Sequence, residues 1–279
     1  TEIYTLSLHD ALPILPKNSL SRFVGKIAEM KLPEPILDFW IRCFIRHYRI
    51  DMSEVEQKSF KSFNDFFTRS LWEGSRPIDE SPAVSPVDGI VGALGKIERD
   101  TLFQAKGISY SLQDLVVNPE YAERFKNGHY VTLYLSPRHY HRIHDPVGGN
   151  IQELFYVPGN LYPVNPFAVH HVPGLFTLNE RLLTLIENKH LGKVAVIKVG
   201  ATIVGKIKVV YDNVVSNQKK TVIHRKYKEI ASQKGDELGR FQMGSTVILL
   251  FEDRPIHFDG LTTGEEIRVG NRLLDLPSK

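Results

Sequence analysis

The sequence is poor in cysteine and has no long apolar run, and both absences restrict what the protein can be. A single cysteine, Cys43, stands among 279 residues, which excludes an internal disulfide framework and is typical of a reducing compartment. No run reaches the roughly eighteen apolar residues that a membrane-spanning helix needs. The first residues also lack the basic, apolar and small-residue order of a secretory signal.

Excess charge is also scarce. The formal net charge is +3, which permits an anionic partner such as a lipid surface but does not require one. We see no dense basic stripe of the kind that nucleic-acid binding uses, so no nucleic-acid partner is expected. Hydrophobic residues make up 42% of the chain and charged residues 24%, the ordinary proportions of a globular protein with a sizeable core.

The chain divides into three parts by composition and pattern. Residues 1–14 look foreign to the rest, and we interpret them as a non-native or disordered stretch without a functional role. Residues 15–75 are predicted to form a helical, membrane-associating segment, and turn signals follow between 75 and 85. Residues 76–279 are predicted to form a β-rich catalytic domain. There is no internal repeat.

A helical pattern runs from residue 15 to about residue 50, with Pro33 and Pro35 at the start of its second half. Apolar side chains recur there at spacings of three and four: Ile36, Phe39, Trp40, Cys43, Phe44 and Tyr48. Asp38 and several arginines occupy the other face. This pattern fits a surface helix packed on its own domain, and it fits equally an interfacial helix with aromatic side chains among lipid head groups.

Short β-branched runs broken by Gly, Pro and Asn predict the strands of the body. They are expected at 90–97, 130–135, 151–157, 193–199, 202–211, 246–251 and 266–269. Short helices are expected at 62–69, 112–116 and 120–125. Because strands and helices do not alternate regularly, a doubly wound parallel sheet is disfavoured. The predicted fold class is α+β, a helical N-terminal segment followed by a largely antiparallel body.

The densest group of chemically useful side chains is the histidine cluster His139, His141 and His144. A metal site is one interpretation, but no carboxylate ligand has matching spacing, and Arg138 and Arg142 would lie beside the cation. General acid–base catalysis is a second interpretation, since imidazole titrates near neutrality. A polar turn with hydrogen-bonded histidines is the third.

Asp88 and Ser245 are the other candidates. Asp88 precedes a glycine and could be an ordinary turn residue, or it could orient a histidine. Ser245 follows Gly244, whose carbonyl no Cβ shields, and leads into an apolar run. Asp88, a histidine of the cluster and Ser245 would supply the three roles of an Asp-His-Ser triad. His170 and His171 have no evident partner and are expected in a loop.

A series of motifs then makes the interpretation specific. They are FNDFFTR at 63–69, RPID at 76–79, PVDG at 86–89, QAKG at 104–107, YSL at 110–112, YLSPR at 134–138, YHR at 140–142, NER at 179–181, VGATIVG at 199–205 and ELGRFQMGST at 237–246, with His144, Gly159 and VNP at 164–166. In this order they resemble the phosphatidylserine decarboxylase proenzymes, the pyruvoyl-dependent family in its bacterial form, from about residue 15 to the C-terminus.

The resemblance implies that the chain cleaves itself between Gly244 and Ser245. Ser245 would attack the Gly244 carbonyl, with His144 as base and Asp88 as its orienting partner, and would end as a pyruvoyl group on the smaller chain. The products would be a large chain, 1–244, and a small chain, 245–279. The family motif usually has leucine where Met243 stands, a similar residue in volume and polarity, so cleavage is expected to survive.

The resemblance also implies the reaction. A Schiff base between the pyruvoyl group and phosphatidylserine would lose CO2 and release phosphatidylethanolamine, with His141 as proton donor or carboxylate contact. No metal is implied, and His139 receives no catalytic role because the family often has another residue there. A lipid substrate favours peripheral association with an anionic membrane on the cytoplasmic side of the cell membrane. A homodimer is a further expectation from the family.

Two other functions remain open from the residues alone. A conventional lipid hydrolase could use Asp88, His144 and Ser245 as a lasting triad and would remain one chain. A non-enzymatic membrane-binding β module would use Gly244 and Ser245 only as the entrance to a strand.

Overall fold

The computed structural model describes residues 17–105, 107–202, 206–217, 221–242, 245–258 and 260–277. The stretch 1–14, Lys106 of the QAKG motif, and Met243 and Gly244 of the expected cleavage site lie outside these ranges. So do the side chain of Ser245 and part of the expected strand 202–211.

The order of elements confirms an α+β fold. The helices are α2 (Lys17–Glu29), α3 (Glu34–Tyr48), α4 (Phe63–Phe67), α5 (Leu112–Val116), α6 (Pro119–Phe125), α7 (Pro166–His171) and α8 (Leu175–Leu178). The strands are β1 (Ala83–Val84), β2 (Gly89–Lys96), β3 (Thr101–Ala105), β4 (Ile108–Ser111), β5 (His129–Leu135), β6 (Arg142–His144), β7 (Gly149–Val157), β8 (Arg181–Asn188), β9 (Gly192–Val199), β10 (Ile207–Val209), β11 (Ile223–Lys226), β12 (Ala231–Ser232), β13 (Glu237–Phe241), β14 (Ser245–Phe251), β15 (Glu266–Ile267) and β16 (Arg272–Leu274).

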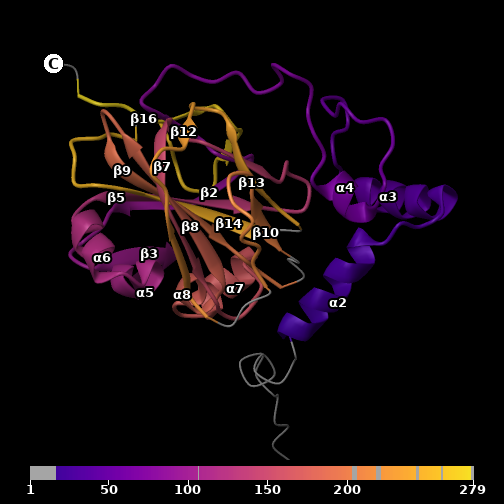
Figure 1. Ribbon diagram of the computed structural model, residues 1–279, viewed down its shortest axis with the longest axis horizontal. Helices are drawn as coiled ribbons and strands as arrows, with labels where there is room; N and C mark the ends of the chain where they lie inside the picture. The colour runs from indigo at the N-terminus through magenta and orange to yellow at the C-terminus, as the bar shows by residue number, and fades with distance from the viewer. Residues whose placement is uncertain are drawn as a thin grey trace, which may run out of the picture.

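One large antiparallel sheet forms the body (Figure 1). Its strands follow the order β11-β7-β8-β9-β14-β5-β2-β15, and β12 adds to β7. A smaller antiparallel sheet has the order β10-β13-β6, and two short pairs, β1-β16 and β3-β4, complete the ladders of the described residues. The largely antiparallel body predicted from the missing strand–helix alternation is therefore confirmed.

The large sheet is covered on both faces. One buried cluster joins its β14 residue Val247 to Ile207 and Phe241 of the smaller sheet. The other joins Ile248 of the same strand to Leu115 and Phe125 of α5 and α6. Because successive side chains of a strand point to opposite faces, β14 carries a continuous apolar run rather than an alternating one.

The N-terminal helices α2, α3 and α4 lie to one side of the body (Figure 1). The expected helical stretch 15–50 is two helices, separated at residues 30–33, and Pro33 precedes the first residue of α3. Leu37 and Ile41 of α3 are buried against Phe66 of α4. None of the described helices is both long and apolar enough to span a membrane.

The expected apolar face of the second helix is only partly covered, because Phe44 and Tyr48 pack against the cluster of Leu37, Ile41 and Phe66. Ile36, Phe39 and Trp40 are 48%, 66% and 61% exposed. The packed interpretation therefore fails for these three side chains but holds for Phe44 and Tyr48, which join Leu37 and Ile41 in the contact with the protein.

Candidate active site

The ends of the central strands bring the candidate residues to one edge of the large sheet. Ser245, the first residue of β14, pairs with Leu135, the last residue of β5, and Thr246 pairs with Val199 at the end of β9. On the other side of β5, Ile90 near the start of β2 pairs with Tyr134. Since neighbouring strands are about 4.8 Å apart, the starts of β14 and β2 are separated by roughly 10 Å.

Ser245 thus occupies the position expected from sequence, at the start of a central strand. Its backbone joins the ladder of β5, while its side chain lies outside the described residues. The apolar run that follows is buried at Val247, Ile248 and Leu249, each with an exposed fraction of 0%. The serine is therefore attached to one of the most rigid elements of the molecule.

His144 lies on β6 and has both ring nitrogens engaged. Nδ1 is 2.7 Å from the carbonyl oxygen of Gly235, and Nε2 is 3.1 Å from the hydroxyl of Tyr140. A carbonyl oxygen can only accept, so Nδ1 carries the proton and Nε2 holds the lone pair. Burial lowers the pKa of His144, and its ring is therefore neutral near neutrality, with Nε2 able to act as a base.

Gly235 can hold His144 because it is a glycine. Its φ is +96°, and a Cβ there would lie 2.8 Å from the side chain of Ile78. A residue with a side chain would be strained and crowded in this turn. In this turn the carbonyl oxygen of Gly235 points at the imidazole of His144. The backbone N–H of Gly235 donates to the carbonyl oxygen of Asp145.

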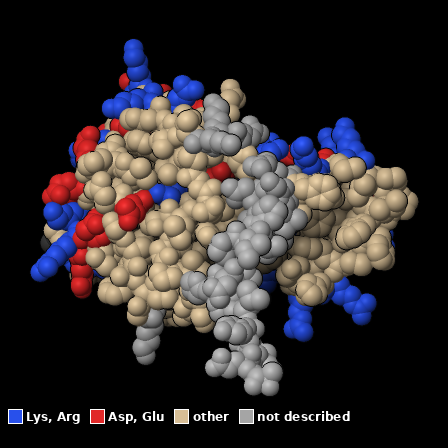
Figure 2. Space-filling model, turned by 90° about the horizontal axis from the view of Figure 1, so that it is seen from below, with Lys and Arg blue, Asp and Glu red and all other residues tan. Residues whose placement is uncertain are grey.

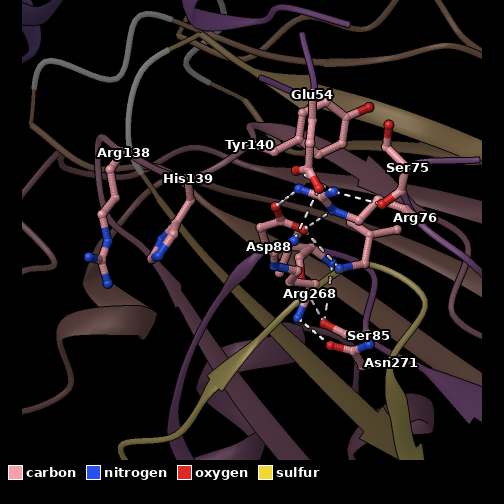
Figure 3. Close-up of polar contacts among 12 residues, drawn as sticks. Glu54, Ser75, Arg76, Ser85, Asp88, Arg138, His139, Tyr140, Arg268 and Asn271 are labelled. Atoms are coloured by element: carbon pink, nitrogen blue, oxygen red, sulfur yellow. Dashed lines mark hydrogen bonds and ion pairs between the residues drawn. The ribbon is translucent and has the colours of Figure 1, made fainter. Parts of the chain in front are cut away.

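Asp88 is bound by an arginine. Its Oδ1 accepts from Arg76 Nε and from the backbone N–H of Val269, both at 2.9 Å, and its Oδ2 accepts from Arg76 Nη2 at 2.6 Å. Figure 3 shows this pair with Glu54, which accepts from Arg76 Nη1. Within the described residues no hydrogen bond joins Asp88 to His144. The negative charge of Asp88 nevertheless favours the protonated form of the His144 imidazole.

His141 is the most deeply buried histidine of the cluster. It is 0% exposed, and its ring stacks on Phe67 of α4 with 4.1 Å between centroids. Neither ring nitrogen has a hydrogen-bond partner of good geometry among the described residues. Burial, followed by the charge of Arg69, holds the pKa of His141 well below its usual value. The backbone of Ser136 and Pro137 still interacts with the ring, and a fully buried imidazole with a strongly shifted pKa is a candidate functional residue.

The loop between β5 and β6 is fixed by His139 and Arg69. His139 Nδ1 accepts from the backbone N–H of Ser136 at 2.9 Å, and burial lowers the pKa of His139 to about 4. Arg69 Nη2 donates to the carbonyl oxygens of Arg138 and His139 at 3.1 and 3.2 Å. His139 therefore helps to shape the loop.

Other candidates lie elsewhere. His170 and His171 belong to α7, and each Nδ1 contacts the carbonyl oxygen four residues earlier. They are helical rather than in a loop, which the sequence prediction had wrong. In the part of the chain that the structure describes, no three His, Cys, Asp or Glu side chains gather as a metal site would require.

Sequence reasoning missed three contributors to this site. Arg76 was noticed only as part of a motif, Tyr140 as a neighbour of histidines, and Gly235 not at all. The motif RPID could have drawn attention to Arg76, because its guanidinium is of the kind that binds carboxylates with two donors. A backbone carbonyl such as that of Gly235 leaves no signal in the sequence.

Comparison with known proteins identifies related chains. A family model described as phosphatidylserine decarboxylase matches residues 63–275. A phosphatidylserine decarboxylase proenzyme of Anaeromyxobacter sp. (strain K) is 46% identical over 271 residues, covering 94% of this chain and 96% of that protein. The proenzyme of Myxococcus xanthus (strain DK1622) is 43% identical over 268 residues, covering 94% and 95%. That of Alteromonas mediterranea is 43% identical over 269 residues, covering 92% and 82%.

Proposed function

The chain belongs to the phosphatidylserine decarboxylase family and is a decarboxylase, and we propose that it converts phosphatidylserine into phosphatidylethanolamine and CO2 with a pyruvoyl group made from its own Ser245. A pyruvoyl group supplies an electrophilic carbonyl and an electron sink for the loss of CO2. The observation that carries the proposal is the position of Ser245 at the start of β14, on the sheet edge where the histidine loop leaves β5.

We propose that self-cleavage begins when His144 Nε2 takes the proton of Ser245 Oγ. The oxygen bonds to the Gly244 carbonyl carbon, the peptide C–N bond breaks, and an ester with a free amine remains. Elimination across Cα–Cβ of Ser245 then releases the Gly244 carboxylate and leaves an enamine. Hydrolysis of that enamine consumes water, releases ammonia and leaves the keto group.

Tyr140 and Asp88 have supporting roles in this proposal. The Tyr140 hydroxyl donates to His144 Nε2 at 3.1 Å and must leave that lone pair before the serine can use it. Asp88 favours the imidazolium that forms, through its charge in the arrangement described, or through a direct contact with His144 if Arg76 releases it. Asp88, His144 and Ser245 thus remain the proposed triad.

The fold explains how a small chain, 245–279, would stay bound to a large chain, 1–244. β14 lies between β5 and β9, β15 pairs with β2, and β16 pairs with β1. The backbone N–H of Val269 also donates to Asp88 across the two chains. Because this segment is hydrogen-bonded on both sides, breaking one peptide bond at its start removes none of its ladders.

We propose that His141 contacts the substrate carboxylate or returns a proton to the carbon that loses CO2. Its burial against Phe67 and the lack of a well-aligned hydrogen bond at either ring nitrogen among the described residues support this role. Its low pKa favours the carboxylate contact, because a neutral imidazole places no cation beside the carboxylate that would oppose departure of CO2, whereas a proton donor would have to be the disfavoured imidazolium.

We also propose that residues 15–75 form the membrane-associating segment, that residues 76–279 form the catalytic domain, and that the enzyme works as a peripheral protein on the cytoplasmic side of an anionic membrane. Phe39 and Trp40 are exposed on α3, and an apolar groove of about 750 Å³ lies between α2, α3 and α4. Figure 2 shows that the lobe at the right, where Figure 1 has the N-terminal helices, presents mainly uncharged side chains on this face with Lys and Arg at its edges, whereas acidic and basic side chains gather at the left of the body. These features suit the boundary between lipid tails and head groups. Assembly as a homodimer is proposed from the family alone.

Intact mass spectrometry of the purified protein tests the proposal. We expect two fragments that divide between Gly244 and Ser245, the smaller beginning with a keto group, together with release of CO2 from phosphatidylserine. Ser245→Ala should remain one chain without activity. The control Ser59→Ala replaces an exposed serine that is far from Ser245 in the sequence, and it should behave as the unaltered protein.

Two results would contradict the proposal. A stable single chain that a serine-directed phosphonate inactivates would indicate a lipid hydrolase. A single chain that binds vesicles but neither reacts with the phosphonate nor releases CO2 would indicate a membrane-binding module.

A further inference from the structure

A cavity of about 360 Å³ opens beside Asp88, and all of its basic lining residues other than one histidine are arginines. They are Arg49, Arg69, Arg76, Arg138 and Arg268. The N-terminal segment, the loop after β5 and the segment around β15 each contribute to the wall. Arginine rather than lysine is the residue that recognises phosphate groups through two parallel N–H donors.

Three of these arginines are already paired with carboxylates. Arg76 is paired with Asp88 and Glu54, as Figure 3 shows. Arg268 reaches the other oxygen of Glu54 at 3.2 Å, and Arg138 contacts Glu266. These pairs fix the positions of the cavity walls.

The other two, Arg49 and Arg69, have no carboxylate partner among the described residues. Arg69 is only 3% exposed, and its Nε and Nη1 donors make no hydrogen bond within the described part of the chain. A buried guanidinium with unused donors is costly unless a ligand supplies acceptors. The lowering of the Arg69 pKa to about 10 by burial expresses the same cost.

Arg49 is an exposed residue that lines the cavity at the C-terminal end of α3. It caps α3 in the left-handed region, with φ 53°, where glycine is the common residue. His139 adds a neutral donor, because its Nδ1 accepts from Ser136 and its Nε2 must then carry the proton. Figure 3 shows the His139 ring beside the Arg138 side chain, both extending from the same loop.

The charge balance of the lining indicates the charge of the ligand. Five arginines face four carboxylates, which are Asp51, Glu54, Asp88 and Glu266. The excess is one positive charge, and a phosphodiester carries one negative charge. The cavity also includes Gly89 at the start of β2, two strands from Ser245 on the same edge of the sheet.

We propose that this arginine cavity binds the phosphodiester of the phospholipid head group, with Arg49 and Arg69 as its specificity-determining residues. This proposal rests on the proposed function. It explains how a head group whose amine reacts at residue 245 would be oriented, since its phosphate would lie toward Asp88 and its glycerol toward the N-terminal helices. Free phosphate offers the same chemistry, so the test distinguishes the two.

Steady-state kinetics of the self-processed enzyme test the proposal with two soluble substrates. Dihexanoyl phosphatidylserine carries the phosphodiester, while O-octylserine has the same amine and carboxylate without phosphate. We expect Arg49→Gln to raise KM for dihexanoyl phosphatidylserine at least tenfold with kcat within twofold, and to leave the kinetics with O-octylserine unchanged. Arg69→Lys should also raise KM for dihexanoyl phosphatidylserine, with processing verified by mass; its kcat is expected to fall as well, because Arg69 holds the loop of His139 and acts on His141. Arg225→Gln, at an exposed arginine of β11, is the matched control.

Three outcomes would overturn the proposal. An unchanged KM in both variants would exclude the cavity from substrate binding. An equal rise for both substrates would show a general effect on the site. Calorimetric binding of inorganic phosphate that Arg49→Gln weakens, without any change in KM for the lipid, would make the cavity a free-phosphate site. Absence of CO2 release by the unaltered enzyme would instead contradict the proposed function.

Discussion

Apolar side chains are buried in the large sheet but exposed on the N-terminal helix α3. In β14 the side chains of Val247, Ile248 and Leu249 are 0% exposed, whereas Phe39 and Trp40 of α3 are 66% and 61% exposed. Both segments are apolar, but the strand is covered on two faces and the helix on one. Stability is therefore concentrated in the sheet, and the exposed side of α3 is available for contact with another phase or molecule.

This difference also separates the two parts of the site. Ser245 is attached to the rigid sheet, while His141 is stacked on Phe67 of α4. A disturbance of the helices can thus reach the histidine without disturbing the serine. Variants in each region should therefore affect different measurements.

Leu249→Ala tests the sheet. Leu249 is in the middle of β14 between β5 and β9, and removal of a fully buried leucine side chain costs about 2–5 kcal/mol. Urea unfolding in the Ser245→Ala background, which keeps one chain, measures the loss. A change below about 1 kcal/mol would show that the sheet is not where stability is concentrated.

Lys198→Met tests a charged side chain that is buried near the C-terminal end of β9. Lys198 is 0% exposed, contacts Thr184 and the Val196 carbonyl, and has the charge of Asp145 nearby. Replacing a buried charge with an apolar side chain of similar length is expected to stabilise the fold by about 1–4 kcal/mol at pH 7.

The pH dependence of the same variant gives a second measurement. Burial lowers the pKa of Lys198 from 10.5 to about 7, so the unfolded chain binds one more proton than the folded chain between these values. Stability of the unaltered protein should therefore rise as pH increases from about 7 to 10.5. Lys198→Met should remove that rise. Equal slopes in the two proteins would show that Lys198 remains charged when buried.

The paired change Phe39→Ser and Trp40→Ser tests the helices. Both side chains are exposed, so the free energy of unfolding should change by no more than about 0.5 kcal/mol per residue. Sedimentation with anionic vesicles should show at least tenfold weaker binding. Phe103→Ser, at a phenylalanine of β3 that is 46% exposed, is the control and should bind as before. An equal loss of vesicle binding in the double variant and in Phe103→Ser would show that α3 has no special role in membrane binding.

The sequence predicted the central strands well and the others poorly. β2, β5, β7, β9 and β14 were expected because each is rich in β-branched residues between turn signals. β8 was missed, since its buried run Leu182–Ile186 has no alternation that distinguishes a strand from a helix. β13 was missed because Gly239 interrupts it. A Cβ at Gly239 would lie 2.3 Å from the Lys208 carbonyl oxygen, so close strand packing requires the glycine.

The residue types of the candidate site could be proposed from the sequence, but their contacts could not. The motifs indicated Asp88, His144 and Ser245, and nothing in their spacing indicated that Arg76 would bind Asp88 or that Gly235 would hold His144. Partners that are backbone atoms or that lie far along the chain depend on how the sheets pack. Asn179 illustrates the point: its amide joins Tyr162 to Gly200, a structural bridge inside a motif.

Asp38→Asn is expected to have the smallest effect on stability, and for that reason it sharpens the comparison. Asp38 and Arg42 form an exposed pair on α3 with 3.5 Å between charged atoms and side chains 42% and 79% exposed. Such pairs contribute only about 0.3–0.5 kcal/mol, and salt screens them. The variant should therefore unfold almost as the unaltered protein does. It also removes a negative charge from the surface that we propose faces anionic lipid, so it should bind anionic vesicles more tightly, in low salt above all. If stability fell by more than about 1 kcal/mol while vesicle binding stayed the same, the charges of α3 would serve the fold rather than the membrane.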